Sequence, residues 1–204
     1  MIKIKALIKE LIPSAFFDYL RYWVWRSQGC PVPPPHRAKQ EIINEYRQKF
    51  GVNVLVETGT YEGETIRAQL AKFQEIISIE VSVDLYEQAI ARFKRHPHVK
   101  LYRGDSGEVL KIIIPELHSP CLFWLDGHYS GGVTGRGILD TPIKAELQTI
   151  FSSRFLHVLL IDDARCFNGQ NGYPTLSELE KWVSQEAKYT FSVKDDIIRL
   201  TPVS

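Results

Sequence analysis

The sequence predicts an α/β protein built on a doubly wound, mostly parallel sheet, with a C-terminal antiparallel hairpin and additional N-terminal helices. Short aliphatic runs alternate with amphipathic stretches from residue 52 onward, as in βαβ proteins. Most of these runs are almost continuously apolar, which is typical of strands covered on both faces. The stretch YTFSVKDDIIRLTP reads as two strands around Asp195-Asp196. Together these patterns favour a layered α/β fold.

Residues 1–35 are predicted to form an N-terminal segment, and residues 36–204 the main domain. Within residues 1–28, Phe16, Leu20 and Trp23 fall on one helical face, and basic residues outnumber acidic ones. The stretch GCPVPPP (29–35) is expected to be a stiff linker. A basic amphipathic helix can lie on an anionic membrane surface. Packing on the domain or across a homo-oligomer interface is the simpler expectation.

The main domain is predicted to contain five parallel strands, at 52–57, 75–80, 99–104, 121–126 and 157–163. The helices between them have recognisable starts. Ser82 is a candidate N-cap, Thr141-Pro142 is a helix start, and Thr175 with Glu178 has the spacing of a capping box. Right-handed crossovers bring the carboxyl ends of the parallel strands to one edge, where such sheets bind ligands.

Acidic residues stand at or just past the ends of all five predicted strands. This placement is hard to explain by sheet stability alone, so we interpret this edge as a ligand site. The acids are Glu57, Glu80, Asp105, Asp126, Asp162 and Asp163.

The first strand leads into a glycine-containing turn, Glu57-Thr58-Gly59-Thr60-Tyr61-Glu62-Gly63. A dinucleotide-binding turn would have the pattern GxGxxG and hold a pyrophosphate. Here Glu57 replaces the first glycine, and carboxylates attract an ammonium or sulfonium rather than a phosphate. Glu80, at the end of the second strand, is placed to accept hydrogen bonds from a ribose. A nucleoside with a cationic tail, such as S-adenosylmethionine (SAM), meets both requirements.

At these residues the sequence resembles class I SAM-dependent methyltransferases, over roughly residues 50–200. The resemblance implies that the turn cradles the methionine part of SAM, that Glu80 holds the ribose, and that Asp105 with Ser106 contacts the adenine. It implies a Rossmann-like methyltransferase sheet. The candidate cofactor-binding residues are Glu57, Gly59, Thr60, Gly63, Glu80, Asp105, Ser106 and Asp126.

Asp126, Asp162 and Asp163 end two strands that we expect to be neighbours. Three carboxylates in one cleft repel each other unless they are protonated or hold a cation, and oxygen ligands suit magnesium. The layout looks like that of metal-dependent O-methyltransferases acting on sugars of macrolide and aminocoumarin antibiotics, which implies a Mg²⁺ site on these three residues. Alternatively, Asp162 caps a helix and Asp126 binds only substrate or cofactor.

The catalytic candidates are Asp126 and His128. His128 stands where the resembled family carries an acidic base, and a neutral imidazole is a competent base near pH 7. The stretches 129–142 and 164–174 follow the same edge of the sheet, so they are candidates for substrate contact. The substrate candidates in them are Tyr129, Arg136, Arg165 and Tyr173.

These features predict SAM-dependent methylation, most simply of a hydroxyl on a small molecule or sugar. Two alternatives stay open: a nicotinamide-dependent oxidoreductase, and a non-catalytic module that binds the cofactor. The net charge of +1 gives no reason to expect a nucleic-acid partner. Three scattered cysteines without a CxxC pair, and the lack of an apolar run of about 18 to 20 residues, favour a cytoplasmic location.

Overall fold

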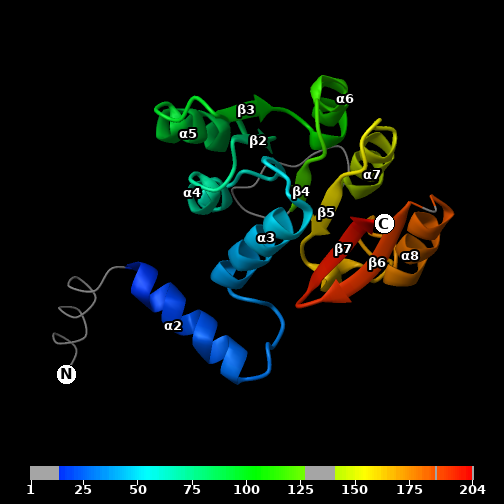
Figure 1. The fold of residues 1–204 in the computed structure, drawn as a ribbon, viewed down its shortest axis with the longest axis horizontal. Helices are drawn as coiled ribbons and strands as arrows, with labels where there is room; N and C mark the ends of the chain where they lie inside the picture. The colour runs from blue at the N-terminus through cyan, green and yellow to red at the C-terminus, as the bar shows by residue number, and fades with distance from the viewer. Residues whose placement is uncertain (1–13, 127–140, 187, 204) are drawn as a thin grey trace.

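The computed structural model describes residues 14–126, 141–186 and 188–203. It contains a seven-stranded sheet of order β3-β2-β1-β4-β5-β7-β6 (Figure 1). The first five strands pair in parallel, and β7 runs antiparallel to both β5 and β6. The predicted fold class is therefore confirmed. The strands are β1 (Val54–Thr58), β2 (Glu75–Glu80), β3 (Val99–Arg103), β4 (Leu122–Leu125), β5 (Val158–Ile161), β6 (Tyr189–Lys194) and β7 (Ile197–Pro202).

Ser82 and Thr175 are N-caps as predicted, and the helix expected to start at Thr141-Pro142 has Pro142 as its N-cap and begins at Ile143. Ser82 Oγ accepts from Leu85 N at 3.5 Å, Thr141 Oγ1 accepts from Ile143 N at 3.3 Å, and Thr175 with Glu178 forms a complete capping box. The helices are α2 (Ser14–Ser27), α3 (His36–Phe50), α4 (Glu64–Gln69), α5 (Val83–Phe93), α6 (Ser106–Glu116), α7 (Ile143–Phe151) and α8 (Leu176–Gln185), with a short 3-10 helix η1 (Ala164–Cys166).

Helices cover both faces of the sheet, because the strands alternate their apolar side chains between two cores. Leu55, Trp124 and Leu160 pack with α3, α4 and α5 on one face. Val56 and Phe123 pack with α6, α7 and α8 on the other. This double burial explains why the strands are almost continuously apolar in sequence.

The chain order of the strands reverses between β1 and β4. From β1 the chain builds outward through β2 and β3, then returns to place β4 on the other side of β1. β2 and β4 therefore lie on opposite sides of β1. In doubly wound sheets this reversal marks the ligand-binding edge.

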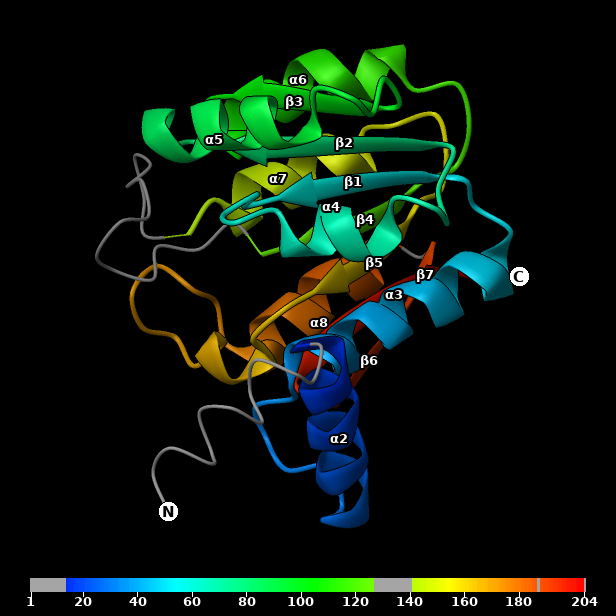
Figure 2. The same ribbon diagram turned by 90° about the vertical axis from the view of Figure 1, so that its left-hand side faces the viewer.

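Helix α2 lies away from the sheet and meets the rest of the chain beside α3 (Figures 1 and 2). Trp25 anchors its end, where the indole Nε1 donates to Pro31 O at 2.8 Å. The face with Phe16, Leu20 and Trp23 is about half exposed. Among the described residues, no helix has the length and apolar character that crossing a membrane requires.

Candidate functional site

The turn after β1 is held against the end of β2. Gly59 and Gly63 have φ values of +86° and +70°, in the left-handed region that glycine adopts most readily. The backbone N–H groups of Gly59 and Thr60 both donate to Ile79 O, at 3.0 and 3.2 Å. The turn thus has a fixed position relative to the neighbouring strand.

Glu57 lies beneath this turn and not at its mouth. The strand register places it beside Ser78, whose Oγ donates to Glu57 Oε2 at 2.7 Å. Ser78 Oγ is also 2.6 Å from Thr60 Oγ1. Glu57 is only 2% exposed, and this burial raises its pKa to about 8. The expectation that the Glu57 carboxylate attracts a cationic ligand is therefore weakened, because a protonated carboxyl group carries no charge.

The buried Glu57 leads to a prediction about pH. In the unfolded chain a glutamate titrates near 4.5, whereas in the folded protein Glu57 keeps its proton up to about pH 8. Between these values the folded state holds the extra proton, so stability falls as pH rises, by at most roughly 1.4 kcal/mol per pH unit. We expect the free energy of unfolding, measured in urea, to decline less steeply between pH 5 and pH 8 in Glu57→Gln than in the wild type. Equal declines in both proteins would contradict this assignment.

Glu80 connects the turn to the end of β2. Its Oε2 accepts from Tyr61 N and its Oε1 accepts from Ser82 N, each at 2.8 Å. A carboxylate has about four acceptor positions, so each oxygen keeps one for a further donor. The predicted role of Glu80 in holding a ribose fits this arrangement and stays a prediction.

Asp105 caps the helix that follows β3. Its Oδ1 accepts from Gly107 N at 2.9 Å, and Ser106 beside it is buried. Gly104 N donates to Glu80 O at 2.9 Å, which places Asp105 next to the end of β2. The glycine turn, Glu80 and Asp105 thus lie in order along one edge of the sheet, as predicted.

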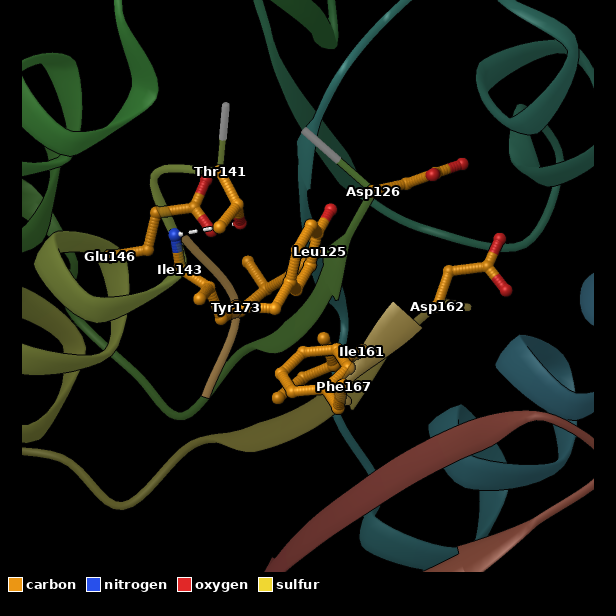
Figure 3. Close-up of a pocket in the computed structure, with 9 residues that line it drawn as sticks. All are labelled: Leu125, Asp126, Thr141, Ile143, Glu146, Ile161, Asp162, Phe167 and Tyr173. Carbon is orange, nitrogen blue, oxygen red and sulfur yellow. Dashed lines mark hydrogen bonds between the residues drawn. The ribbon is translucent and has the colours of Figure 1, made fainter. Parts of the chain in front are cut away.

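Asp126 and Asp162 extend from the ends of the neighbouring strands β4 and β5 (Figure 3). The backbone holds both positions, because Asp126 N donates to Thr58 O at 3.2 Å and Asp162 N donates to Leu125 O at 3.0 Å. The Asp162 side chain is fully buried. Burial, followed by the charge of Asp126, raises the pKa of Asp162 to about 7. The predicted meeting of these acids is therefore observed.

Lys39 is the residue at this site that the sequence did not reveal. It comes from the first turns of α3, and its Nζ donates to Asp162 Oδ2 and lies 3.7 Å from Asp163 Oδ1. Burial by itself lowers the pKa of Lys39, but the surrounding carboxylates, Asp162 above all, raise it overall. Lys39 is therefore a fixed cation among the acids.

Asp163 has a second cationic neighbour. Arg165 donates from its guanidinium to Asp163 Oδ1 at 2.7 Å and also pairs with Asp196, in the turn between β6 and β7. Asp196 also accepts from Arg165 N through Oδ1 at 2.8 Å. A predicted metal ligand and a predicted substrate residue thus contact each other, and the proposed substrate role of Arg165 stays a prediction.

These contacts bear on the predicted magnesium site. The donor set has the right chemistry, but Asp162 faces Lys39 and Asp163 faces both Lys39 and Arg165. Within the described ranges, no three His, Cys, Asp or Glu side chains are arranged so that they could hold a metal ion. The described residues therefore do not fit magnesium in this arrangement, and the magnesium site stays a prediction.

A small cavity of about 10 Å³ lies beside Asp126, large enough for about one water molecule (Figure 3). Tyr173 and Glu146 line it. Burial raises the pKa of Glu146 to about 7, and its Oε1 has no hydrogen-bond partner among the described residues. The sequence contained a signal for Glu146, because it follows Ile143 by three positions on the buried face of α7.

Three predicted site residues lie outside the described residues. These are the catalytic candidate His128 and the substrate candidates Tyr129 and Arg136. Their assigned roles stay predictions.

No model of a protein family matches the chain, and no curated protein matches its sequence. Its fold does match solved structures. The O-methyltransferase from Bacillus cereus in complex with S-adenosylhomocysteine has a TM-score of 0.60 and 14% identity, covering 98% of this chain and 96% of that chain. The O-methyltransferase TomG from Streptomyces achromogenes in complex with SAM has a TM-score of 0.60 and 13% identity, covering 99% and 96%. A methyltransferase from Podospora anserina bound to S-adenosylhomocysteine has a TM-score of 0.61 and 15% identity, covering 99% and 94%. At these identities the likeness establishes a shared fold.

Proposed function

We propose that this protein, which has the fold of class I SAM-dependent methyltransferases, transfers the methyl group of SAM to a hydroxyl oxygen of a small molecule or sugar. The observation that carries the proposal is the link between Glu80 and the glycine turn, through Tyr61 N at 2.8 Å. It holds the Glu80 carboxylate and the glycine-containing turn side by side at the edge where the strand order reverses, which supports the proposed role of Glu80 as a ribose acceptor.

The residues suit this chemistry in distinct ways. SAM supplies an electrophilic methyl group, whose carbon–sulfur bond breaks as the carbon–oxygen bond to the acceptor forms. Glu80 and the turn would hold the cofactor so that its methyl group faces the acceptor oxygen. Such positioning supplies much of the acceleration in a displacement reaction. The acceptor hydroxyl must also release a proton, for which Asp126 and His128 are the candidate bases. We assign no step to magnesium, because Lys39 and Arg165 contact two of the three proposed ligands.

Calorimetric titration of the protein with SAM, S-adenosylhomocysteine and NADH tests the proposal. We expect both adenosyl compounds to bind at micromolar concentration and NADH not to bind. Binding of NADH without binding of SAM would instead support the alternative oxidoreductase. The third candidate, a non-catalytic binding module, would bind SAM but transfer no methyl group to any hydroxyl acceptor in a screen with labelled SAM.

The location and partners remain proposals as well. We infer a cytoplasmic enzyme with a small-molecule or sugar substrate and no nucleic-acid partner, as its near-neutral charge suggests. For the exposed face of α2 we favour self-association over peripheral membrane contact. The reason is that Phe16, Leu20 and Trp23 form an apolar stripe on a helix whose main contact, among the described helices and strands, is with α3.

We expect the full chain to have a solution mass near twice the 23.5 kDa of one chain by size exclusion with light scattering. The double variant Leu20→Ser/Trp23→Ser should be monomeric and still folded, since both side chains are about half exposed within a single chain. Ile90→Ser/Ile112→Ser removes exposed apolar side chains elsewhere and should not change the mass. A monomeric wild type that floats with anionic liposomes would favour the membrane instead.

A further inference from the structure

The acidic cluster, defined as Asp126, Asp162 and Asp163, is contacted by cationic side chains of the same protein. The Asp162 side chain has no exposed surface and that of Asp163 is 10% exposed. Carboxylates removed from water in this way require a cation or a proton. Among the described residues, a cation that contacts Asp162 comes from a distant part of the chain.

That side chain is Lys39, which enters the cluster from the side of α3. Its Nζ contacts Asp162 and lies 3.7 Å from Asp163, and its side chain is 18% exposed. Arg165 contacts the same Asp163 oxygen, Oδ1, at 2.7 Å. Two of the three carboxylates therefore contact a cation that the protein itself provides.

The position of Lys39 is built into the fold, because α3 is tied down at the adjacent residue. Gln69 in α4 donates from Nε2 to both Gln40 O at 3.1 Å and Gln40 Oε1 at 2.8 Å. Gln40 in turn donates to Thr65 Oγ1 at 3.2 Å. This buried network fixes the turn of α3 that carries Lys39, so the ammonium group is delivered by a rigid element.

A divalent ion at the cluster would need the same oxygen atoms. Magnesium binds carboxylate oxygens at about 2.0–2.1 Å and requires near-octahedral geometry. An ammonium group on Asp162 and a guanidinium group on Asp163 occupy acceptor positions of those oxygens and repel a further dication at short range.

We propose that the Lys39 ammonium takes the place of a divalent metal ion in the acidic cluster, so that the cluster binds no divalent ion. Lys39 and Arg165 supply two positive charges against the three carboxylates, so these five side chains together keep a net negative charge. This deepens the proposed function, because it makes methyl transfer at this site independent of metal.

Manganese binding, measured from the loss of the free Mn²⁺ signal in electron paramagnetic resonance, tests the proposal directly. We expect the wild type to bind no Mn²⁺ at 1:1 stoichiometry below about millimolar concentration, and Lys39→Met to bind it at least 10-fold more tightly. Lys39→Arg keeps the charge and should behave as the wild type does. Lys111→Met removes a lysine from an exposed ion pair with Glu108 and should cause no gain.

Two outcomes would overturn the proposal. One is stoichiometric Mn²⁺ binding by the wild type that Asp162→Asn abolishes; this readout does not depend on whether any lysine variant folds. The other is a folded Lys39→Met protein, verified by circular dichroism, that gains no affinity for Mn²⁺.

The activity measurement depends on the proposed function and is read separately. Methyl transfer by the wild type should proceed at the same rate in EDTA and in MgCl₂. A protein that binds neither SAM nor Mn²⁺ would contradict the methyltransferase proposal but not the role of Lys39. If EDTA reversibly inactivated methyl transfer, the methyltransferase proposal would be supported and the proposed role of Lys39 would be overturned.

Discussion

Replacing Glu80 by Gln is expected to weaken SAM binding about 100-fold. The Glu80 carboxylate accepts from Tyr61 N and Ser82 N, each at 2.8 Å. A glutamine offers one acceptor oxygen, so its NH₂ group would face one of these N–H donors. The ribose would also lose a charged acceptor, and hydrogen bonds to charged groups contribute about 1.5–3 kcal/mol. A loss in the upper part of that range corresponds to about 100-fold in affinity.

Glu75→Gln is the matched control, because it makes the same change at the other end of the same strand. Glu75 pairs with Lys100 at 2.7 Å on the surface. Calorimetric titration should give Glu75→Gln the same affinity for SAM as the wild type. If Glu80→Gln also kept that affinity, the assignment of Glu80 to the cofactor would be wrong.

Replacing Gly63 by Ala is expected to destabilise the fold by about 2–5 kcal/mol. Gly63 has a φ of +70°, where an alanine is strained by roughly 1–2 kcal/mol. An added Cβ would also lie 2.6 Å from Cε2 and 2.8 Å from Cζ of Phe93. Phe93 is buried between α5 and the sheet, so its ring has little room to move, and such overpacking costs about 1–3 kcal/mol.

Gly51→Ala separates the two contributions. Gly51 has a similar φ of +62°, but an added Cβ would meet no atom within 4 Å. We expect Gly51→Ala to lower the free energy of unfolding, measured in urea, only by the backbone contribution of about 1–2 kcal/mol. If both variants lost the same free energy, the contact with Phe93 would contribute nothing. Gly63→Ala should in addition weaken SAM binding, because it distorts the turn that follows β1.

The sequence was sufficient to predict the sheet, because each strand carries its own local signal. Strands such as β2 and β5 are apolar on both faces, and Ser82 and Thr175 are caps whose hydrogen bonds span three residues. The acids at the carboxyl edge were predicted for the same reason. The end of a strand can be recognised locally, and the parallel topology brings the ends together.

The sequence did not predict what each acid contacts. Lys39 and Asp162 are 123 positions apart, and their contact depends on how α3 packs on the sheet. A lysine in an amphipathic helix ordinarily faces water, so no spacing distinguished this one. The burial of Glu57 was missed similarly, because it depends on the register that places Ser78 of β2 beside it.

The contact between Arg165 and Asp196 also has a consequence for biosynthesis. Asp196 lies in the turn that joins the two antiparallel strands, and Ala164 N donates to its backbone oxygen at 2.8 Å. A nascent polypeptide that has not yet emerged past Asp196 lacks the group that holds the segment after β5. The edge that carries the acids is therefore complete only after Asp196 itself has left the ribosomal tunnel and can pair with Arg165.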